Sequence, residues 1–328
     1  MNSPLLPLVW EAKSARRTLF ASKSLVFAAF GIFLAATVQA GSAPKVVASI
    51  KPLHSLVAGV MQGVGAPGLI VEGAGSPHSY SLKPSDAAEL ESADLVFWAG
   101  PDLEAFLESP IDVLGRNAKV VALSEAHGLK LLPPREGGEF EAHDHEDDDH
   151  DLEHQGADMH FWLYPLNARA MVREIEEALS KIDAGNADLY AKNAERLEEE
   201  LYKLDAEIRG ILAPVAGKPY VVFHDGYQYF EKHYGLNAIG SISVSPEAIP
   251  GAQRVTEMQG KVKELGAVCV FSEPQFEPRL VAVIAEGSDA RSGVLDPLGA
   301  GLADGPDQYF ELMRNLAESL AECLAGEG

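Results

Sequence analysis

The sequence alternates short β-rich runs with helix-like runs in both of its halves, and this pattern restricts the fold more than any other feature. The β-rich runs cover residues 45–50, 69–72, 94–98, 119–123, 219–224, 268–272 and 293–295. The helix-like runs cover residues 53–62, 85–91, 103–107, 227–234, 254–265, 279–285 and 308–324. Such alternation is typical of βα units, so we predict an α/β fold with parallel sheets.

A long helical segment separates the two halves. Residues 167–212 have a strongly helical composition, with a break at 183–185. Apolar residues recur there at spacings of three and four, as at Leu197, Leu201, Leu204 and Ile208. This spacing predicts amphipathic helix, so we expect a helical linker with one α/β lobe on each side.

The first 40 residues have the pattern of a secretory signal peptide. Four basic residues precede an apolar stretch at 24–37, and small residues at 38 and 40 provide a cleavage site. A membrane anchor is the alternative, but this stretch of about 14 residues is shorter than the ~20 that a spanning helix needs. The mature chain is therefore expected to start near Gly41 and to work in the periplasm or outside the cell.

The charge balance argues against nucleic-acid binding. The chain carries 49 acidic and 26 basic residues, a formal net charge of −23, and this surplus repels phosphate backbones. A hydrophobic content of 47% still suits a protein with buried cores. Two cysteines are too few for a thiolate zinc site. In an oxidising compartment we expect Cys269 and Cys323 to form a disulfide.

Five of the ten histidines fall within 143–160, beside a dense run of acidic residues. Residues 136–158 are almost wholly Asp, Glu, His and Gly, so they are predicted to form a surface loop. One hypothesis is a second, weaker zinc site formed by His143, His145, His150 and His154. The alternative is a solvated linker that binds metal only incidentally.

Four polar residues stand at loop boundaries or strand tips, where α/β proteins bind ligands. His78 lies between a predicted strand and helix, and His160 follows the acidic loop. His224 and Asp296 stand at the tips of two predicted strands. Singly, each has a structural alternative: a loop histidine, part of a polar run, a hydrogen-bonded strand end or a turn aspartate. Together, three imidazoles with a carboxylate or water form a set typical of zinc.

Eight short motifs point to one family. They cover residues 49–53, 77–80, 83–86, 159–163, 223–227, 250–254, 271–276 and 295–299. At these motifs the chain resembles the ZnuA-type, zinc-specific periplasmic substrate-binding proteins of ABC importers. The resemblance implies two Rossmann-like (β/α) lobes with parallel sheets, joined by a long rigid helix, with a metal cleft between them. It implies metal ligands at His78, His160 and His224 and a carboxylate at Asp296.

The resemblance also bears on which metal is bound. Manganese-type relatives carry Glu at the position of His224, so this histidine favours Zn²⁺ as the transported ligand. Many zinc-type relatives carry Glu directly before the first ligand histidine, where this chain has Pro77. The fourth ligand is therefore Asp296 or a water molecule. The pair Cys269 and Cys323 also matches the disulfide of zinc-type relatives.

The resulting hypothesis is a transport receptor and not an enzyme. The predicted parts are a signal peptide at 1–40, an N-terminal lobe at 41–165, a helical linker at 166–213 and a C-terminal lobe at 214–328. We expect a periplasmic monomer that captures Zn²⁺ with high affinity and delivers it to an inner-membrane ABC permease.

Two other function classes are alternatives. A secreted zinc hydrolase also uses three protein ligands, but the sequence has no His-Glu-x-x-His run and no Gly-x-Ser-x-Gly elbow. A metal-binding adhesin would need surface anchoring, and no cysteine for lipid attachment follows the predicted cleavage site. Enzymatic turnover would distinguish the hydrolase from a receptor that binds zinc stoichiometrically.

Overall fold

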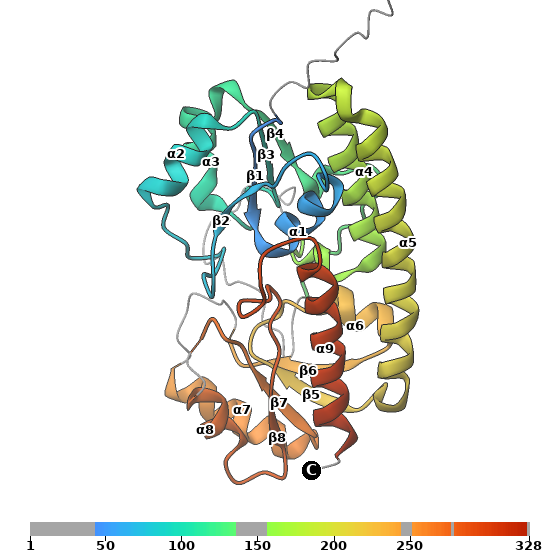
Figure 1. Ribbon diagram of the computed structural model, residues 1–328. Coiled ribbons are helices and arrows are strands. Elements are labelled where there is room, and N and C mark those ends of the chain that lie inside the picture. Colours follow the sequence, from blue (N-terminus) through green and yellow to red (C-terminus); the bar gives the residue numbers. More distant parts are fainter. Residues whose placement is uncertain (1–42, 136–155, 244–250, 277–278, 327–328) are drawn as a thin grey trace, which may run out of the picture. The chain divides into compact units, whose positions relative to one another are not determined.

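Two parallel sheets of four strands each form the framework (Figure 1). The computed structural model describes residues 43–135, 156–243, 251–276 and 279–326. The N-terminal sheet, in the order β2-β1-β3-β4, contains β1 (Val46–Ile50), β2 (Gly68–Val71), β3 (Leu95–Trp98) and β4 (Lys119–Ala122). The C-terminal sheet, in the order β6-β5-β7-β8, contains β5 (Pro219–Val222), β6 (Asn237–Ser241), β7 (Cys269–Ser272) and β8 (Arg291–Val294). The predicted α/β class is confirmed.

Helices connect the strands in both halves. The N-terminal half contains α1 (Lys51–Val60), α2 (Pro84–Ser92) and α3 (Ala105–Leu114). The C-terminal half contains α6 (Gln228–Tyr234), α7 (Ala252–Glu264), α8 (Arg279–Ala285) and α9 (Gln308–Ala325). Proline and glycine residues mark the ends of several of these helices. Pro52 and Pro84 open α1 and α2 in their first turns, and Gly235 ends α6 in the left-handed conformation at φ 71°.

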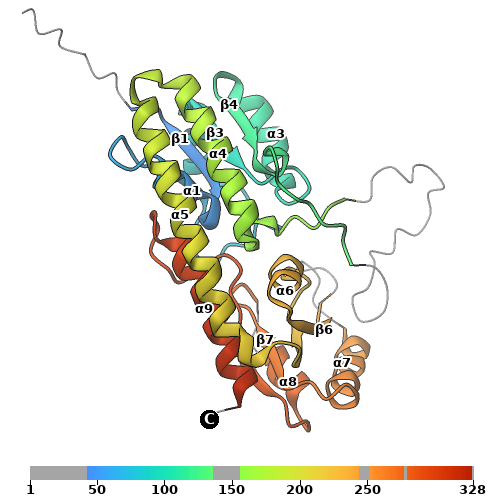
Figure 2. The same cartoon turned by 90° about the vertical axis from the view of Figure 1, so that its right-hand side faces the viewer.

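The helical segment between the two sheets folds back on itself. Helices α4 (Pro165–Ile182) and α5 (Ala187–Leu212) lie side by side (Figures 1 and 2). The turn between them is held by Asp183, whose carboxylate accepts hydrogen bonds from Tyr190 at 2.8 Å and from Asn186 at 2.7 Å. Helix α5 also packs against α9, and α1 contacts α4, α5 and α9. These four helices therefore connect the start of the fold with its end.

One strand was missed by the sequence pattern. β6 contains Asn, Gly and Ser and is only partly buried, so it lacks the composition of a core strand. It forms because its backbone pairs in parallel with β5 at the edge of the C-terminal sheet, and tertiary pairing can outweigh intrinsic strand propensity.

The disulfide prediction is confirmed. Cys269 on β7 is bonded to Cys323 on α9, with their Cα atoms 6.2 Å apart. The bond fixes the last helix to an inner strand of the C-terminal sheet. The guanidinium of Arg291 on β8 donates to the Cys323 carbonyl oxygen, at 2.9 Å from Nε, and adds a second link.

Two predicted segments lie outside the described residues. These are the signal peptide at 1–40 and most of the acidic loop, at 136–155. The boundaries of the two lobes and the linker stay predictions. Within the residues that are described, no helix combines the length and apolar character needed to cross a membrane.

Candidate metal centre

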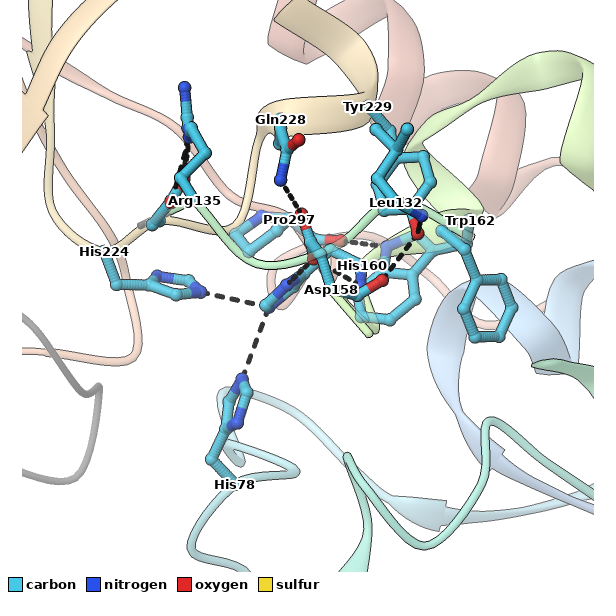
Figure 3. Close-up of polar contacts among 12 residues, drawn as sticks. His78, Leu132, Arg135, Asp158, His160, Trp162, His224, Gln228, Tyr229 and Pro297 are labelled. Carbon is cyan, nitrogen blue, oxygen red and sulfur yellow. Dashed lines mark hydrogen bonds and ion pairs between the residues drawn. The ribbon is translucent and has the colours of Figure 1, made fainter. Parts of the chain in front are cut away.

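Three histidines from distant parts of the chain bring their rings together, as Figure 3 shows. His78 lies between β2 and α2, His160 precedes a short helical turn at Phe161–Leu163, and His224 follows β5. The Nε2 atom of His160 lies 3.3 Å from Nε2 of His78 and 3.1 Å from Nε2 of His224. The structure thus gathers the three predicted histidine ligands into one cluster.

Carboxylates fix the tautomer of two of these rings. Nδ1 of His160 lies 2.9 Å from Oδ1 of Asp158, and Nδ1 of His224 lies 2.7 Å from Oε1 of Glu273. An ionised carboxylate can only accept a hydrogen bond, so each Nδ1 carries the proton and donates it. In the neutral rings, the Nε2 atoms that face each other therefore present lone pairs, and converging lone pairs favour a bound cation.

The spacing of these nitrogen atoms suits zinc. Tetrahedral zinc with Zn–N bonds of ~2.0–2.1 Å places its ligand nitrogens about 3.3–3.4 Å apart. The two closest Nε2–Nε2 separations, 3.3 and 3.1 Å, are near this value. An ion can therefore enter with little movement of the rings. Ca²⁺ and Mg²⁺ prefer more ligands, mostly oxygen, than this cluster offers.

Burial and neighbouring charges set the protonation of the rings. Burial, followed by the nearby His160 and His224, lowers the pKa of His78 to about 2. Its ring is therefore neutral at physiological pH, the form in which imidazole binds metals. Burial alone would also lower the pKa of His224, but the adjacent Glu273 carboxylate outweighs it and raises the pKa. The same carboxylate makes the ring a stronger metal ligand.

The Asp158 carboxylate is itself held in place by α6 (Figure 3). The Oδ2 atom of Asp158 accepts a hydrogen bond from Gln228 at 3.2 Å, and the backbone oxygen of Asp158 accepts one from the Tyr229 hydroxyl at 2.6 Å. Its backbone nitrogen donates to the Leu132 oxygen at 2.9 Å. These contacts restrict the carboxylate that orients His160, so the ring is positioned before any ion arrives.

The space between the rings is small. It measures about 10 Å³, near the ~10–15 Å³ needed for one water molecule. Pro77, Trp162, Phe276 and Pro297 are among the residues around it. Such a wall admits few additional ligands, which favours a low coordination number.

Gly226 lies against two of the rings, and a residue with a Cβ does not fit there. A Cβ at this position would lie 2.6 Å from Nε2 of His224 and 3.1 Å from Cδ2 of His160. The first distance is shorter than non-bonded atoms allow, so glycine lets the backbone come this close to the metal centre.

The structure gives Asp296 a different set of contacts. Its carboxylate accepts hydrogen bonds from the backbone of Leu298 at 3.1 Å, Gly299 at 2.9 Å and Ala300 at 2.6 Å, and from Gln275 at 3.0 Å. Among the described residues, the metal-binding cluster comprises the three histidines without it. Asp296 as fourth ligand stays a prediction and would require the carboxylate to exchange some of these bonds for the ion.

Four predicted ligands lie outside the described residues, and three residues at the site had no predicted role. The loop histidines His143, His145, His150 and His154 lie outside the described residues. Asp158, Glu273 and Gly226 were not predicted to have a role at the site. Asp158 lies two residues before His160, so its proximity was visible in the sequence. Glu273 lies 49 residues from His224, and only the fold brings the two together.

Comparison with known proteins identifies the family. Residues 46–323 match the family described as zinc-uptake complex component A, periplasmic (ZnuA). The chain belongs to the ZnuA family. The high-affinity zinc uptake system protein ZnuA of Brucella suis is 52% identical over 311 residues, which cover 87% of this chain and 93% of that protein. Its Yersinia pestis counterpart is 39% identical over 289 residues, covering 85% and 91% respectively.

Solved structures of the ZnuA family have the same fold. A crystal structure of a ZnuA deletion mutant with zinc bound is 25% identical to this chain, with a TM-score of 0.72. The match covers 87% of this chain and all of that chain, 100%. The resemblance inferred from the sequence motifs is thereby confirmed over residues 46–323.

Proposed function

We propose that this chain is the zinc receptor of an ABC importer. It captures Zn²⁺ with high affinity in the periplasm, and His78, His160 and His224 bind the ion. The observation that carries the proposal is the convergence of their Nε2 atoms, two of which present lone pairs because carboxylates hold the Nδ1 protons. Asp296 or a water molecule supplies the fourth ligand.

The transport role rests on the ZnuA relatives. They are named zinc uptake system proteins, and the family is described as a periplasmic component of a zinc-uptake complex. We infer that residues 1–40 are removed as a signal peptide and that the mature monomer delivers Zn²⁺ to an inner-membrane ABC permease. The lobes at 41–165 and 214–328 hold the ion between them, and the linker at 166–213 limits their relative motion.

Neutral imidazoles select borderline metals over hard ones, so Zn²⁺ is preferred to Ca²⁺ or Mg²⁺. Copper binds nitrogen ligands more strongly than zinc does by intrinsic order. Selectivity against copper therefore depends on the enclosed geometry and on metal availability.

Metal analysis with competition titration on the purified mature chain tests the site. The wild type is expected to bind one Zn²⁺ tightly, and a variant with His78, His160 and His224 all changed to alanine should lose this tight binding. His127→Ala is the control, because His127 is an exposed histidine outside the cluster. Equal Zn²⁺ affinity in the wild type and the triple variant would refute the site.

The second, weaker site at His143, His145, His150 and His154 remains part of the proposal. Four histidines among dense carboxylates can bind exposed Zn²⁺ loosely and supply it to the main site. Deletion of residues 139–156 should then lower the number of weakly bound zinc ions and slow uptake at limiting zinc. Unchanged stoichiometry and uptake would leave an ordinary solvated linker.

A further inference from the structure

A second cavity lies apart from the metal centre. It measures about 200 Å³ and is lined by Lys130, Leu132, Tyr164, Tyr229, Lys232 and His233. None of these residues lines the space between the three histidines. The cavity, called the basic groove below, is formed by α6, the start of α4 and the segment 130–132.

The basic groove carries positive charge in a strongly acidic chain. Two of its lining residues are lysines, although acidic residues outnumber basic ones by 49 to 26 in the sequence. The Lys232 ammonium donates a hydrogen bond to the neutral side chain of Gln228. Among the described residues, neither Lys130 nor Lys232 has a carboxylate at ion-pair distance. Their charges can therefore attract an anionic ligand.

The acidic side chain that contacts His233 is already engaged. Asp205 accepts from Nε2 of His233 at 2.6 Å and forms an ion pair with Arg209 at 3.5 Å. Its negative charge is directed toward these two groups. The His233 ring, in turn, stacks edge-on against Tyr164, with the ring centroids 4.8 Å apart. This contact holds the Tyr164 ring in place at the wall of the groove.

The other walls of the basic groove are aromatic and aliphatic. Tyr164, Tyr229 and Leu132 contribute apolar surface suited to a flat ligand. The Tyr229 hydroxyl is occupied, because it donates to the Asp158 oxygen at 2.6 Å and accepts from the Leu132 nitrogen at 2.8 Å (Figure 3). It therefore holds the wall in place. A ligand here would make apolar contacts with the wall and ionic contacts with the lysines.

We propose that the basic groove binds a small organic carboxylate with a planar, apolar body. A cavity of about 200 Å³ is smaller than the ~300–1,000 Å³ of sites for drug-sized ligands, so the ligand is small, with on the order of ten non-hydrogen atoms. The carboxylate lies near the two ammonium groups, and the planar body lies against the tyrosine rings. This site is independent of the zinc-receptor proposal.

Titration of the mature chain with benzoate, followed by NMR chemical shifts or calorimetry, tests the groove. Benzoate should bind saturably and more weakly at high salt, because exposed charge pairs are screened. Benzamide has the same shape without the charge and should bind much less. The double variant K130A/K232A should bind benzoate about tenfold more weakly. Both lysines are exposed, so the variant is expected to fold normally.

The matched control is K192A/K203A, which removes two exposed lysine charges on α5. It should bind benzoate like the wild type, which would exclude a general effect of net charge. Equal binding of benzoate and benzamide, or unchanged affinity in K130A/K232A, would overturn the proposal. So would the absence of saturable binding, which is the result expected if a protein partner or another part of the chain fills the groove.

Discussion

The two sheets have the same strand order but are stabilised differently. The N-terminal sheet shares one continuous core with α1, α4, α5 and α9, and one face of the C-terminal sheet, with Tyr220 and Phe271, belongs to the same core. In the C-terminal sheet, residues such as Val221, Phe223 and Ile242 form a separate, smaller cluster with α7 and α8. That sheet also has the disulfide to α9. Both sheets thus use the shared core, and the C-terminal sheet has in addition a local core on its other face and a covalent link to α9.

The three proposed metal ligands also differ in how they are held. His224 follows a strand of the C-terminal sheet, is buried, and donates to Glu273. His160 is buried as well and donates to Asp158. His78 comes from a loop of the N-terminal half and is only partly buried. The proposed centre therefore has two buried ligands that carboxylates orient in advance, and a third that comes from an N-terminal loop and is less buried.

Removal of a single ligand should give the largest effect on zinc binding. Structural Zn²⁺ binding of ~10–16 kcal/mol shared among three or four ligands is about 3–4 kcal/mol per ligand, or roughly 100- to 1,000-fold in affinity. We expect His160→Ala to lie at the upper end, because His160 is oriented in advance and contacts both other rings. His78→Ala should lie at the lower end.

Competition titration with a zinc chelator measures both variants, and His127→Ala serves as the control. A larger loss of zinc affinity for His78→Ala than for His160→Ala would contradict the proposal that orientation by Asp158 makes His160 the more important ligand. Circular dichroism of each variant without metal should match that of the wild type, which separates lost binding from lost folding.

The disulfide should matter for stability and not for metal binding. It joins residues 54 positions apart, and the loop-entropy model gives about 4 kcal/mol for a closed loop of this length. The double variant C269S/C323S should lose about this free energy of unfolding in denaturant titrations without metal. The zinc affinity of its folded form should stay within about twofold of wild type, because neither cysteine lines the metal centre. A stability change below about 1 kcal/mol would show that the core holds α9 without the bond.

The sequence predicted the framework because the framework is encoded locally. Strand–helix alternation and the break at 183–185 appear as periodic patterns, and both are present in the structure. β6 was missed, since its residues depend on pairing with β5 rather than on their own propensity. The disulfide could be predicted because the predicted compartment is oxidising and the chain has only two cysteines, which allow a single pairing.

The metal site was predictable only in part. The three histidines stand at boundaries of predicted elements, so their positions suggested a shared site before the fold was known. The role of Glu273 could not be inferred, because it depends on the parallel pairing of β5 with β7, which brings the ends of both strands together. The bonds of Asp296 to the turn after it, by contrast, match the turn aspartate that its residue type allowed as the alternative to a metal ligand.

The orienting carboxylates should have a smaller effect than the ligands themselves. Outer hydrogen-bond partners of metal ligands typically change metal affinity by ~10–100-fold. Glu273→Gln and Asp158→Asn keep the side-chain size but remove the charge that fixes the Nδ1 proton, so both should weaken Zn²⁺ binding within this range. Asp304→Asn is the control, because Asp304 pairs with Lys51 and does not contact the ligands. An effect of Glu273→Gln no larger than that of Asp304→Asn would show that the orientation of His224 does not depend on this bond.

The smallest expected effect concerns a buried carboxyl group in the N-terminal half. Glu104 is fully buried, and its Oε2 accepts from the backbone of Ala99 at 2.7 Å and of Gly100 at 3.4 Å. Burial outweighs these bonds and raises the pKa of Glu104 from 4.5 to about 7. Between these values the folded state holds a proton that the unfolded state releases. The stability that this proton contributes is therefore complete below pH 4.5 and is lost as the pH rises through about 7.

Glu104→Gln resembles the protonated form at every pH and should remove this dependence. The stability of the wild type relative to E104Q should fall by about 1 kcal/mol between pH 5 and pH 6, within the ~1.4 kcal/mol per pH unit that one proton allows. Denaturant titrations at several pH values measure this difference, and Glu108→Gln, at an exposed position on α3, is the control.

Glu231 in the C-terminal half is a buried carboxyl group with a charged partner, because its carboxylate pairs with Arg135 at 2.6 Å. Glu231→Gln would leave that arginine partly unpaired and should destabilise the protein even at pH 8, where E104Q should not. Burial raises the pKa of Glu231 to about 7 as well, so the two variants should respond similarly to pH and differ in stability at pH 8. Equal stability of E104Q and E231Q at pH 8 would mean that the arginine does not distinguish the two buried carboxyl groups.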